Sequence, residues 1–285
     1  MRRCAVAILG IVVLDASGGP CPVPTPPVIG TNGIDFVPFQ ADSCALVTSI
    51  TNAYTGETIA IDGTYWVSSA EYYDGLGGFD SLAFFNNRLQ GDFLQLRSND
   101  VQTVFNIEVF TAAGGNDVVN LSDSEFVIGD IFLNMGKEND IGWANSGNDT
   151  VNGSFGNDIL NGGPGNDIVN GGPDNDQIYF GLGSGIDDID GVDGTDEIVF
   201  TGAISYSDLV ITQMGDPARL GYNIQVGLAG DAFTSRNVEG LRFADNSYRT
   251  LIPCAADVSP VEGDLVVNIA GLLQVVAQWA AKGGP

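Results

Sequence analysis

A nine-residue unit recurs between Met135 and Val199, and its sixth residue is Asp in every copy. Cut in register, the copies read MGKENDIGW, ANSGNDTVN, GSFGNDILN, GGPGNDIVN, GGPDNDQIY, LGSGIDDID and GVDGTDEIV, with Phe180 and Gly181 inserted before the sixth copy. A short fixed period is typical of a stacked solenoid rather than of a globular core. We therefore expect an all-β parallel β-roll or β-helix solenoid. In each unit the first six residues should form a turn and the last three a short strand.

The eighth residue of the unit predicts the core of this solenoid. In so short a strand, one inward side chain per coil has to build the interior. The eighth residues are apolar: Leu82, Val119, Val151, Leu160, Val169, Ile178, Ile189 and Ile198. Gly142 is the exception, and it predicts a weak or widened layer at that coil.

The repeated Asp residues should form two separate ladders. Two turns close one flattened coil, so turns on the same edge recur every second unit. One edge would hold Asp140, Asp158, Asp176 and Asp196, and the other Asp149, Asp167 and Asp187. Neighbouring coils stack about 4.8 Å apart, so uncompensated carboxylates would repel one another. A cation between them would meet two carboxylates and turn carbonyls, and Ca²⁺, which accepts about six to eight hard oxygens, suits such a site better than Mg²⁺.

Two outlying copies place the start of the repeat earlier in the chain. GLGGFDSLA, residues 75–83, carries Asp80, and AAGGNDVVN, residues 112–120, carries Asp117; degenerate coils such as FVIGDIFLN lie between. The predicted metal ligands are therefore Asp80, Asp117, Asp140, Asp149, Asp158, Asp167, Asp176, Asp187 and Asp196.

GGPGNDIVN matches the pattern G-G-x-G-x-D-x-U-x and resembles the repeat of the RTX, or haemolysin-type calcium-binding, proteins. The resemblance implies a parallel β-roll with Ca²⁺ held in the turns by the sixth-position Asp and by backbone oxygens. MGKENDIGW and GGPDNDQIY lack the fourth-position Gly, which predicts distorted or weak sites there. The alternative is an ion-free β-helix built on Asx turns. That alternative explains Asn and Gly, but not an acid where Asn would turn equally well.

Charge and composition exclude several classes of function. The chain has a formal charge of −26, with 28 Asp against 8 Glu, so nucleic acid and anionic membranes are poor partners. It has no His, which removes a Ser-His-Asp triad and His-based zinc sites. No catalytic residues emerge, and we expect a non-enzymatic protein whose one cofactor is Ca²⁺.

The N-terminus predicts export. Residues 1–18 combine Arg2 and Arg3 with an apolar run too short to span a bilayer, as in a secretory signal peptide, and residues 19–30 form a Pro-rich spacer. We expect a secreted or cell-surface protein without a membrane span. Cys21, Cys44 and Cys254 could form one disulfide, whose pairing the sequence leaves open.

The rest of the chain divides by pattern. Residues 31–111 predict an N-terminal β region with the degenerate repeat at 75–83, residues 112–199 the roll, and residues 200–253 a β cap. Residues 254–285 predict a short C-terminal α-helix and resemble one half of a dockerin-like EF-hand repeat. Its possible loop ligands are Asp257, Ser259, Asp264 and Asn268. A helix that caps the solenoid is the alternative.

Two functions remain open from the sequence. The first is a secreted Ca²⁺-binding β-roll with a structural or adhesive role toward an extracellular protein or polysaccharide. The second is a non-catalytic module, or a divergent member, of an extracellular polysaccharide-active enzyme. Trp66, Tyr72 and Tyr73 could offer sugar-stacking surfaces, although such aromatics more often pack within strands.

Overall fold

The computed structural model describes residues 7–8, 11–12, 28–39, 41–68, 72–84, 91–98, 101–213, 221–226 and 230–251. The chain divides into two compact units, Met1–Ile252 and Pro253–Pro285, and the description below concerns the first. Most of the predicted signal peptide and spacer lies outside the described residues. So does the whole dockerin-like tail, and so do Cys21 and Cys254.

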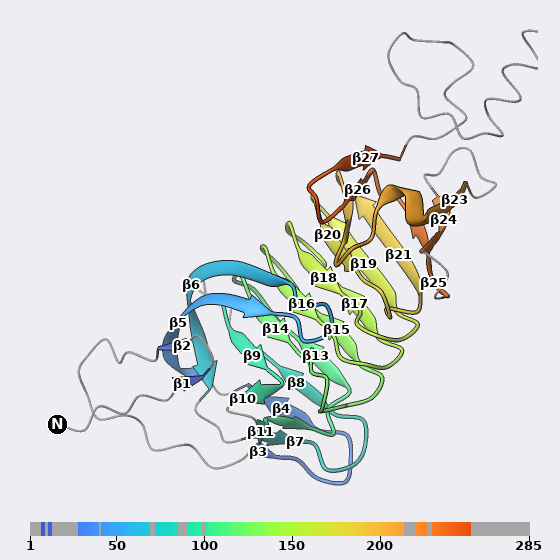
Figure 1. Ribbon diagram of the computed structural model, residues 1–285. Helices are drawn as coiled ribbons and strands as arrows, with labels where there is room; N and C mark the ends of the chain where they lie inside the picture. Colours follow the sequence, from blue (N-terminus) through green and yellow to red (C-terminus); the bar gives the residue numbers. More distant parts are fainter. Residues whose placement is uncertain are drawn as a thin grey trace, which may run out of the picture. The chain divides into compact units, whose positions relative to one another are not determined.

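Two sheets of mostly parallel strands form the roll, and the chain alternates between them (Figure 1). The ten-stranded sheet contains, in spatial order, β4 (Phe36–Pro38), β8 (Ser81–Ala83), β13 (Val109–Thr111), β15 (Phe132–Asn134), β17 (Thr150–Asn152), β19 (Ile168–Pro173), β21 (Ile186–Asp193), β25 (Asp231–Arg236), β24 (Gly221–Val226) and β23 (Leu209–Gln213). The eight-stranded sheet contains β9 (Phe93–Gln95), β14 (Val118–Asn120), β16 (Ile141–Trp143), β18 (Ile159–Asn161), β20 (Gln177–Phe180), β22 (Glu197–Phe200), β26 (Gly240–Arg242) and β27 (Tyr248–Thr250).

The register of these strands follows the nonapeptide. Val151 in β17 pairs in parallel with Leu133 in β15 and with Val169 in β19, so equivalent residues of successive coils lie side by side. Each strand of the regular repeat begins at the seventh residue, directly after the six-residue turn, except β21, which begins two residues earlier. The predicted all-β parallel roll is confirmed. In the described part of the chain the one helical element is a 3₁₀ turn, η1 (Tyr206–Asp208).

The eighth residues build the core, as predicted. Each is at most 2% exposed between the two sheets: Leu82, Val119, Val151, Leu160, Val169, Ile178, Ile189 and Ile198. Burial of one branched apolar side chain contributes about 1.5–3 kcal/mol, and the contribution repeats with every coil.

The widened layer predicted at Gly142 is wrong. Met135 and Leu133 are both fully buried, and a Cβ atom on Gly142 would press against both side chains. The missing side chain is therefore replaced by the long side chain of Met135 from the start of the same unit. A small residue opposite a large flexible one keeps the interior at normal density.

A long β-hairpin covers the outer face of the eight-stranded sheet. Its strands, β5 (Ala41–Thr51) and β6 (Thr58–Ser68), lie across β9, β14 and β16 in Figure 1. They enclose a second apolar core whose buried members are Ala45, Val47, Ile50, Tyr65, Val67, Phe93, Val118, Ile141 and Trp143. At the hairpin turn, Nδ2 of Asn52 donates to Oδ1 of Asn161 (3.2 Å). The short β runs predicted for this region did not indicate a hairpin packed on the roll.

Smaller sheets complete the N-terminal part. β5 also pairs with β2 (Ile11–Val12), which pairs with β1 (Ala7–Ile8). A three-stranded sheet joins β12 (Val104–Phe105), β7 (Tyr73–Asp74) and β3 (Val28–Ile29), and β10 (Arg97–Ser98) pairs with β11 (Val101–Gln102). Tyr73 is 2% exposed within the main core and Tyr72 packs edge-on against Phe105, so strand packing accounts for both tyrosines.

The predicted β cap closes the roll after β22. Antiparallel strands β23 and β24 extend one sheet, β27 ends the other, and Phe180, Phe200, Phe233 and Phe243 pack between them. Arg236 and Arg242 bind Asp188 and Glu197 across neighbouring strands, at 2.7 Å each. Within the described ranges, no helix has the length and apolar character needed to cross a membrane.

Candidate metal centre

The sixth-position Asp residues form two hydrogen-bonded ladders, one on each edge of the roll. On the first edge the backbone N–H of Asp140 donates to Oδ1 of Asp158, and Asp158 donates in the same way to Asp176 (2.8 Å each). Asp176 continues the ladder to Asp196 (2.8 Å). On the second edge Asp149 donates to Asp167 (2.8 Å) and Asp167 to Asp187 (3.0 Å). The two predicted ladders are confirmed, and their hydrogen bonds fix the direction of every carboxylate.

The second carboxylate oxygen of nearly every ladder residue has no partner. Oδ2 is buried and makes no hydrogen bond in Asp80, Asp117, Asp140, Asp149, Asp158, Asp167, Asp176 and Asp196. These residues are at most 1% exposed. A buried polar atom without a partner typically costs about 1–3 kcal/mol, and a charged one more. A cation bound along this row would supply the partner that these oxygens lack. Asp187, the ninth predicted ligand, lies on the second ladder and is 6% exposed.

Glycine at the first position of the unit makes room for this oxygen. A Cβ atom on Gly162 would overlap Oδ2 of Asp167, and a Cβ on Gly153 would overlap Oδ2 of Asp158. The same Cβ on Gly153 would also meet the carbonyl oxygen of Gly171. Where the first residue is Gly, the unit thus keeps a space beside its carboxylate that has no side chain in it.

Glycine at the fourth position lets the turns stack. A Cβ on Gly156 would overlap the carbonyl oxygen of Glu138 in the turn before it, and a Cβ on Gly165 that of Gly147. Both glycines also adopt positive φ, 126° and 156°. Close stacking brings the turn carbonyls of successive coils together, where they can act as neutral oxygen ligands.

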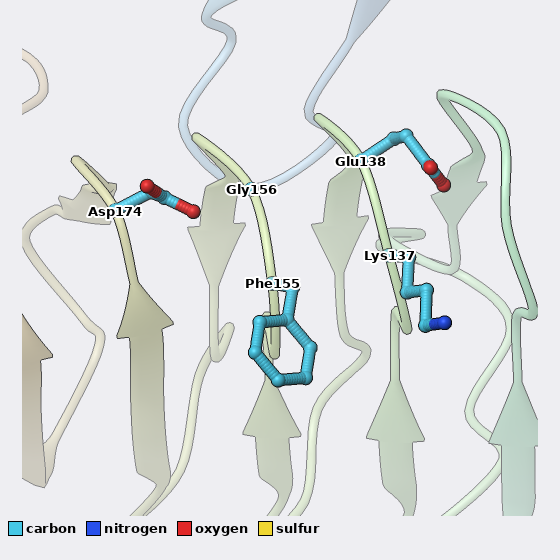
Figure 2. A pocket seen from close by; sticks show the side chains of 5 residues that line it. All are labelled: Lys137, Glu138, Phe155, Gly156 and Asp174. Carbon is cyan, nitrogen blue, oxygen red and sulfur yellow. The ribbon is translucent and has the colours of Figure 1, made fainter.

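The two units that lack this glycine keep the ladder hydrogen bonds. Glu138 and Asp174 take its place with φ of 69° and 83°, and the ladder bonds from Asp140 and Asp176 stay at 2.8 Å. These φ values differ from the 126° and 156° of Gly156 and Gly165, and the distorted or weak sites expected in these two units stay a prediction. Their carboxylates are exposed and flank the turn that carries Phe155, in a shallow depression whose other lining residues include Lys137 and Gly156 (Figure 2).

Asn residues at the fifth position form further ladders that run in the opposite direction. The N–H of Asn157 donates to Oδ1 of Asn139 (2.8 Å), and that of Asn175 to Asn157 (2.9 Å). On the other edge Asn166 donates to Asn148 (3.1 Å). These amides have partners within the turns, so the Asn residues are explained by hydrogen bonding alone. The acids are not.

Burial sets the electrostatics of the ladders. Burial, together with the repulsion of neighbouring carboxylates, raises the pKa of Asp149, Asp176 and Asp187 to about 8. The same two causes raise the pKa of Asp140 to about 10. The pKa rises to about 7 in Asp117, Asp167 and Asp196 and to about 6 in Asp158, with burial again the largest cause. Without a cation, the folded roll resists full ionisation at neutral pH.

These raised pKa values predict an inverted pH dependence for the Ca²⁺-free protein. A carboxyl whose folded pKa exceeds its unfolded value contributes stability that is complete below the unfolded pKa and is lost as pH rises through the folded one. In Ca²⁺-free buffer we expect the urea midpoint to fall as pH rises from about 4, until the roll no longer folds near neutral pH. With saturating Ca²⁺ the trend should reverse, because protons compete with the ion for the carboxylates. A Ca²⁺-free midpoint that rises over this interval would contradict the prediction.

The ladders include residues that the sequence did not single out. Asp35 donates to Oδ1 of Asp80 (2.8 Å), and β4 directly after it pairs with β8, so the roll begins one coil before the predicted start. Its unit, GTNGIDFVP, fits the repeat pattern and buries Val37, so the signal was present. The N–H of Asp92 donates to Oδ1 of Asp117 (2.6 Å) from NRLQGDFLQ, which has Asp and Leu at the sixth and eighth positions but lacks the first- and fourth-position glycines. In FVIGDIFLN the sixth position is Ile131, which breaks the second ladder.

The donor set suits Ca²⁺. Among the described residues no three acidic or Cys side chains gather at one point. A cation between two coils would therefore use two carboxylates and complete its shell with turn carbonyls. Hard oxygens with adaptable geometry are the ligands that Ca²⁺ prefers.

Residues 143–178 match the RTX calcium-binding nonapeptide repeat, in four copies. The matched segment contains Asp149, Asp158, Asp167 and Asp176, two from each ladder. A search of curated proteins gives no match for this chain. Repeats of this family bind calcium as a β-roll, in agreement with the fold and with the buried carboxylates.

Proposed function

We propose that this chain, which carries RTX-type calcium-binding repeats, acts outside the cell as a non-enzymatic structural or adhesive module that folds on Ca²⁺. The observation that carries the proposal is the row of buried Oδ2 atoms without partners. The ions would lie between successive turns of one edge. Their ligands would come from Asp80, Asp117, Asp140, Asp149, Asp158, Asp167, Asp176, Asp187 and Asp196, together with turn carbonyls.

Ca²⁺ supplies the positive charge that the stacked carboxylates lack. Extracellular modules bind it with dissociation constants on the order of 10⁻⁴–10⁻³ M. The N-terminal apolar run supports export, so the roll would meet enough Ca²⁺ only after leaving the cell. Folding would then follow secretion.

The outer face of the ten-stranded sheet exposes apolar side chains, which supports an interaction role. Phe132 and Ile168 are 40% and 53% exposed on this face. They sit in one register row with Thr150 between them, beside a row formed by Asn134, Asn152 and Asn170. The hairpin covers the corresponding positions on the other sheet. Apolar and amide side chains in adjacent rows are suited to contact with a protein or glycan surface.

The choice between a module and an enzyme can be tested directly. Incubation of the Ca²⁺-loaded protein with alginate, pectin and other acidic glycans should give no turnover, whether or not the glycan binds. Release of shortened or unsaturated products would favour the polysaccharide-active alternative.

Asp158→Asn tests the metal ligands. The amide oxygen can still accept from the Asp140 N–H, so the ladder persists, but the charge is lost. We expect one or more Ca²⁺ sites on that edge to weaken by at least about tenfold, as removal of a charged ligand typically costs more than about 1.4 kcal/mol. Isothermal titration with Ca²⁺ measures the effect.

Asp174→Asn is the matched control for this variant. It removes the same charge from the same edge, but its carboxylate is exposed in the turn. The control should titrate like the unmodified protein. Equal titrations for Asp158→Asn and the unmodified protein would remove Asp158 from the ligand set.

A further inference from the structure

We propose that the roll holds two further Ca²⁺ sites of mixed type, one between Asp80 and Glu108 and one between Asp196 and Glu239. Both lie outside residues 143–178, and in each the turn that carries the Glu does not follow the nonapeptide. The inference rests on the proposed function and extends it to a second kind of turn.

The two turns share a sequence and a conformation. One is Asn106-Ile107-Glu108 and the other Asn237-Val238-Glu239. The Asn has a φ of 50° in both, and the middle residue is at most 1% exposed. The regular turn has an exposed Asn at this middle place, so these turns are a distinct variant that the fold uses twice.

The Glu of each turn occupies the ladder position of an Asp. The N–H of Asp80 donates to Oε2 of Glu108 (2.7 Å), and that of Asp196 to Oε2 of Glu239 (2.8 Å). The two turns also share a backbone hydrogen bond. The N–H of Glu108 donates to the carbonyl oxygen of Asp80 (3.1 Å), and that of Glu239 donates to the carbonyl oxygen of Asp196 (3.0 Å). These side-chain bonds span 28 and 43 residues, against 18 in the regular coils. The variant turn thus marks the return of the chain to the roll after a longer excursion.

Each turn faces a buried oxygen that lacks a partner. Oδ2 of Asp80 and Oδ2 of Asp196 make no hydrogen bond, and both residues are 0% exposed. The space beside each is kept open by a glycine. A Cβ on Gly75 would overlap both Oδ2 of Asp80 and the carbonyl oxygen of Asn106.

The second site repeats this arrangement. A Cβ on Gly191 would overlap both Oδ2 of Asp196 and the carbonyl oxygen of Asn237. Each place therefore brings together an unpaired Asp oxygen, an Asn carbonyl and a Glu carboxylate on the neighbouring coil. Two carboxylates and a carbonyl form the start of a Ca²⁺ shell that water can complete.

Asp231 is a contrasting case, an acid of the same roll that needs no cation. Its Oδ2 accepts from the N–H of Gly183 (2.9 Å) and its Oδ1 from that of Gly185 (3.1 Å). Both oxygens are occupied by backbone donors of the preceding turn, so no cation is required. At Glu108 and Glu239 the preceding Asp keeps an oxygen for which the described residues offer no donor.

Glu108→Gln and Glu239→Gln distinguish a cation site from an acid that only ends the ladder by accepting a hydrogen bond. Gln keeps an oxygen that can accept from the Asp N–H and loses only the charge. In the full chain at neutral pH, native mass spectrometry and Ca²⁺ titration should show one ion fewer for each variant and two fewer for the double variant. Glu197→Gln is the control, because its carboxylate binds Arg242 on the outer face one residue after Asp196. It should keep the full number of ions.

Unchanged stoichiometry and affinity in both Gln variants would overturn the inference. The two Glu residues would then only end the ladders by hydrogen bonding. If a Gln variant does not fold, the Asp variant at that position, which keeps the charge but shortens the side chain, decides. Weaker binding of one ion supports the site, and unchanged binding overturns it. Failure of the proposed function looks different, since the unmodified protein would then bind no Ca²⁺ at all.

Discussion

Chelation of Ca²⁺ at neutral pH is expected to unfold the roll. Each ladder carboxylate that loses its cation leaves a charge in a buried position, and burial opposes that charge. An ion that binds only the folded state adds about 2.7 kcal/mol per site at a hundred times its dissociation constant. Several such sites together rival the whole stability of a typical domain, about 5–15 kcal/mol. Folding should therefore depend on Ca²⁺ as a cooperative switch.

Trp143 provides the measurement. It is 1% exposed beneath the hairpin and follows Asp140 by three residues, so in a Trp66→Phe, Trp279→Phe background its fluorescence reports on both the turn and the second core. Excess EGTA should shift its emission to that of a solvated indole and abolish the β signal in circular dichroism, and added Ca²⁺ should restore both. Mg²⁺ at the same concentration is the control and should restore little. An unchanged β signal and urea midpoint in chelator would exclude Ca²⁺-dependent folding.

Gly156→Ala is expected to destabilise the repeat strongly. Its Cβ would overlap the carbonyl oxygen of Glu138, and its φ of 126° lies in a region that L-residues avoid. Overpacking costs about 1–3 kcal/mol. The backbone conformation adds about 1–3 kcal/mol. We expect the free energy of unfolding in saturating Ca²⁺ to fall by about 2–5 kcal/mol, measured by urea denaturation.

Gly202→Ala controls for backbone conformation alone. Gly202 also has positive φ, at 70°, but no atom lies within 4 Å of its added Cβ. Its substitution should cost about 1 kcal/mol. Similar losses for the two variants would mean that close stacking of the turns does not decide stability.

The sequence predicted the roll and both Asp ladders because a strict period fixes them. Once six residues turn and three extend, alternate units must share an edge, so Asp140 and Asp158 could be assigned to one ladder without coordinates. Asp35 was within reach of the same reasoning, since GTNGIDFVP obeys the pattern. Only its distance from the regular copies hid it.

The remaining features depend on contacts that no local pattern encodes. Met135 fills the gap at Gly142 only because the two side chains point into the same layer. The hairpin of β5 and β6 packs on the outer row of Val118 and Ile141. In the sequence these two residues do not differ from other strand positions. Glu108 and Glu239 entered the ladders through turns of a different sequence.

The direction of the Asp ladder gives the roll a preferred order of assembly. The donor that aims the Asp158 carboxylate is the N–H of Asp140, in the coil nearer the N-terminus, and the same holds at Asp167 and Asp176. A coil that is already in place therefore presents the template for the next one to be added. For a chain that emerges N-terminus first, each new carboxylate meets its guide on arrival, so growth of the stack is directional.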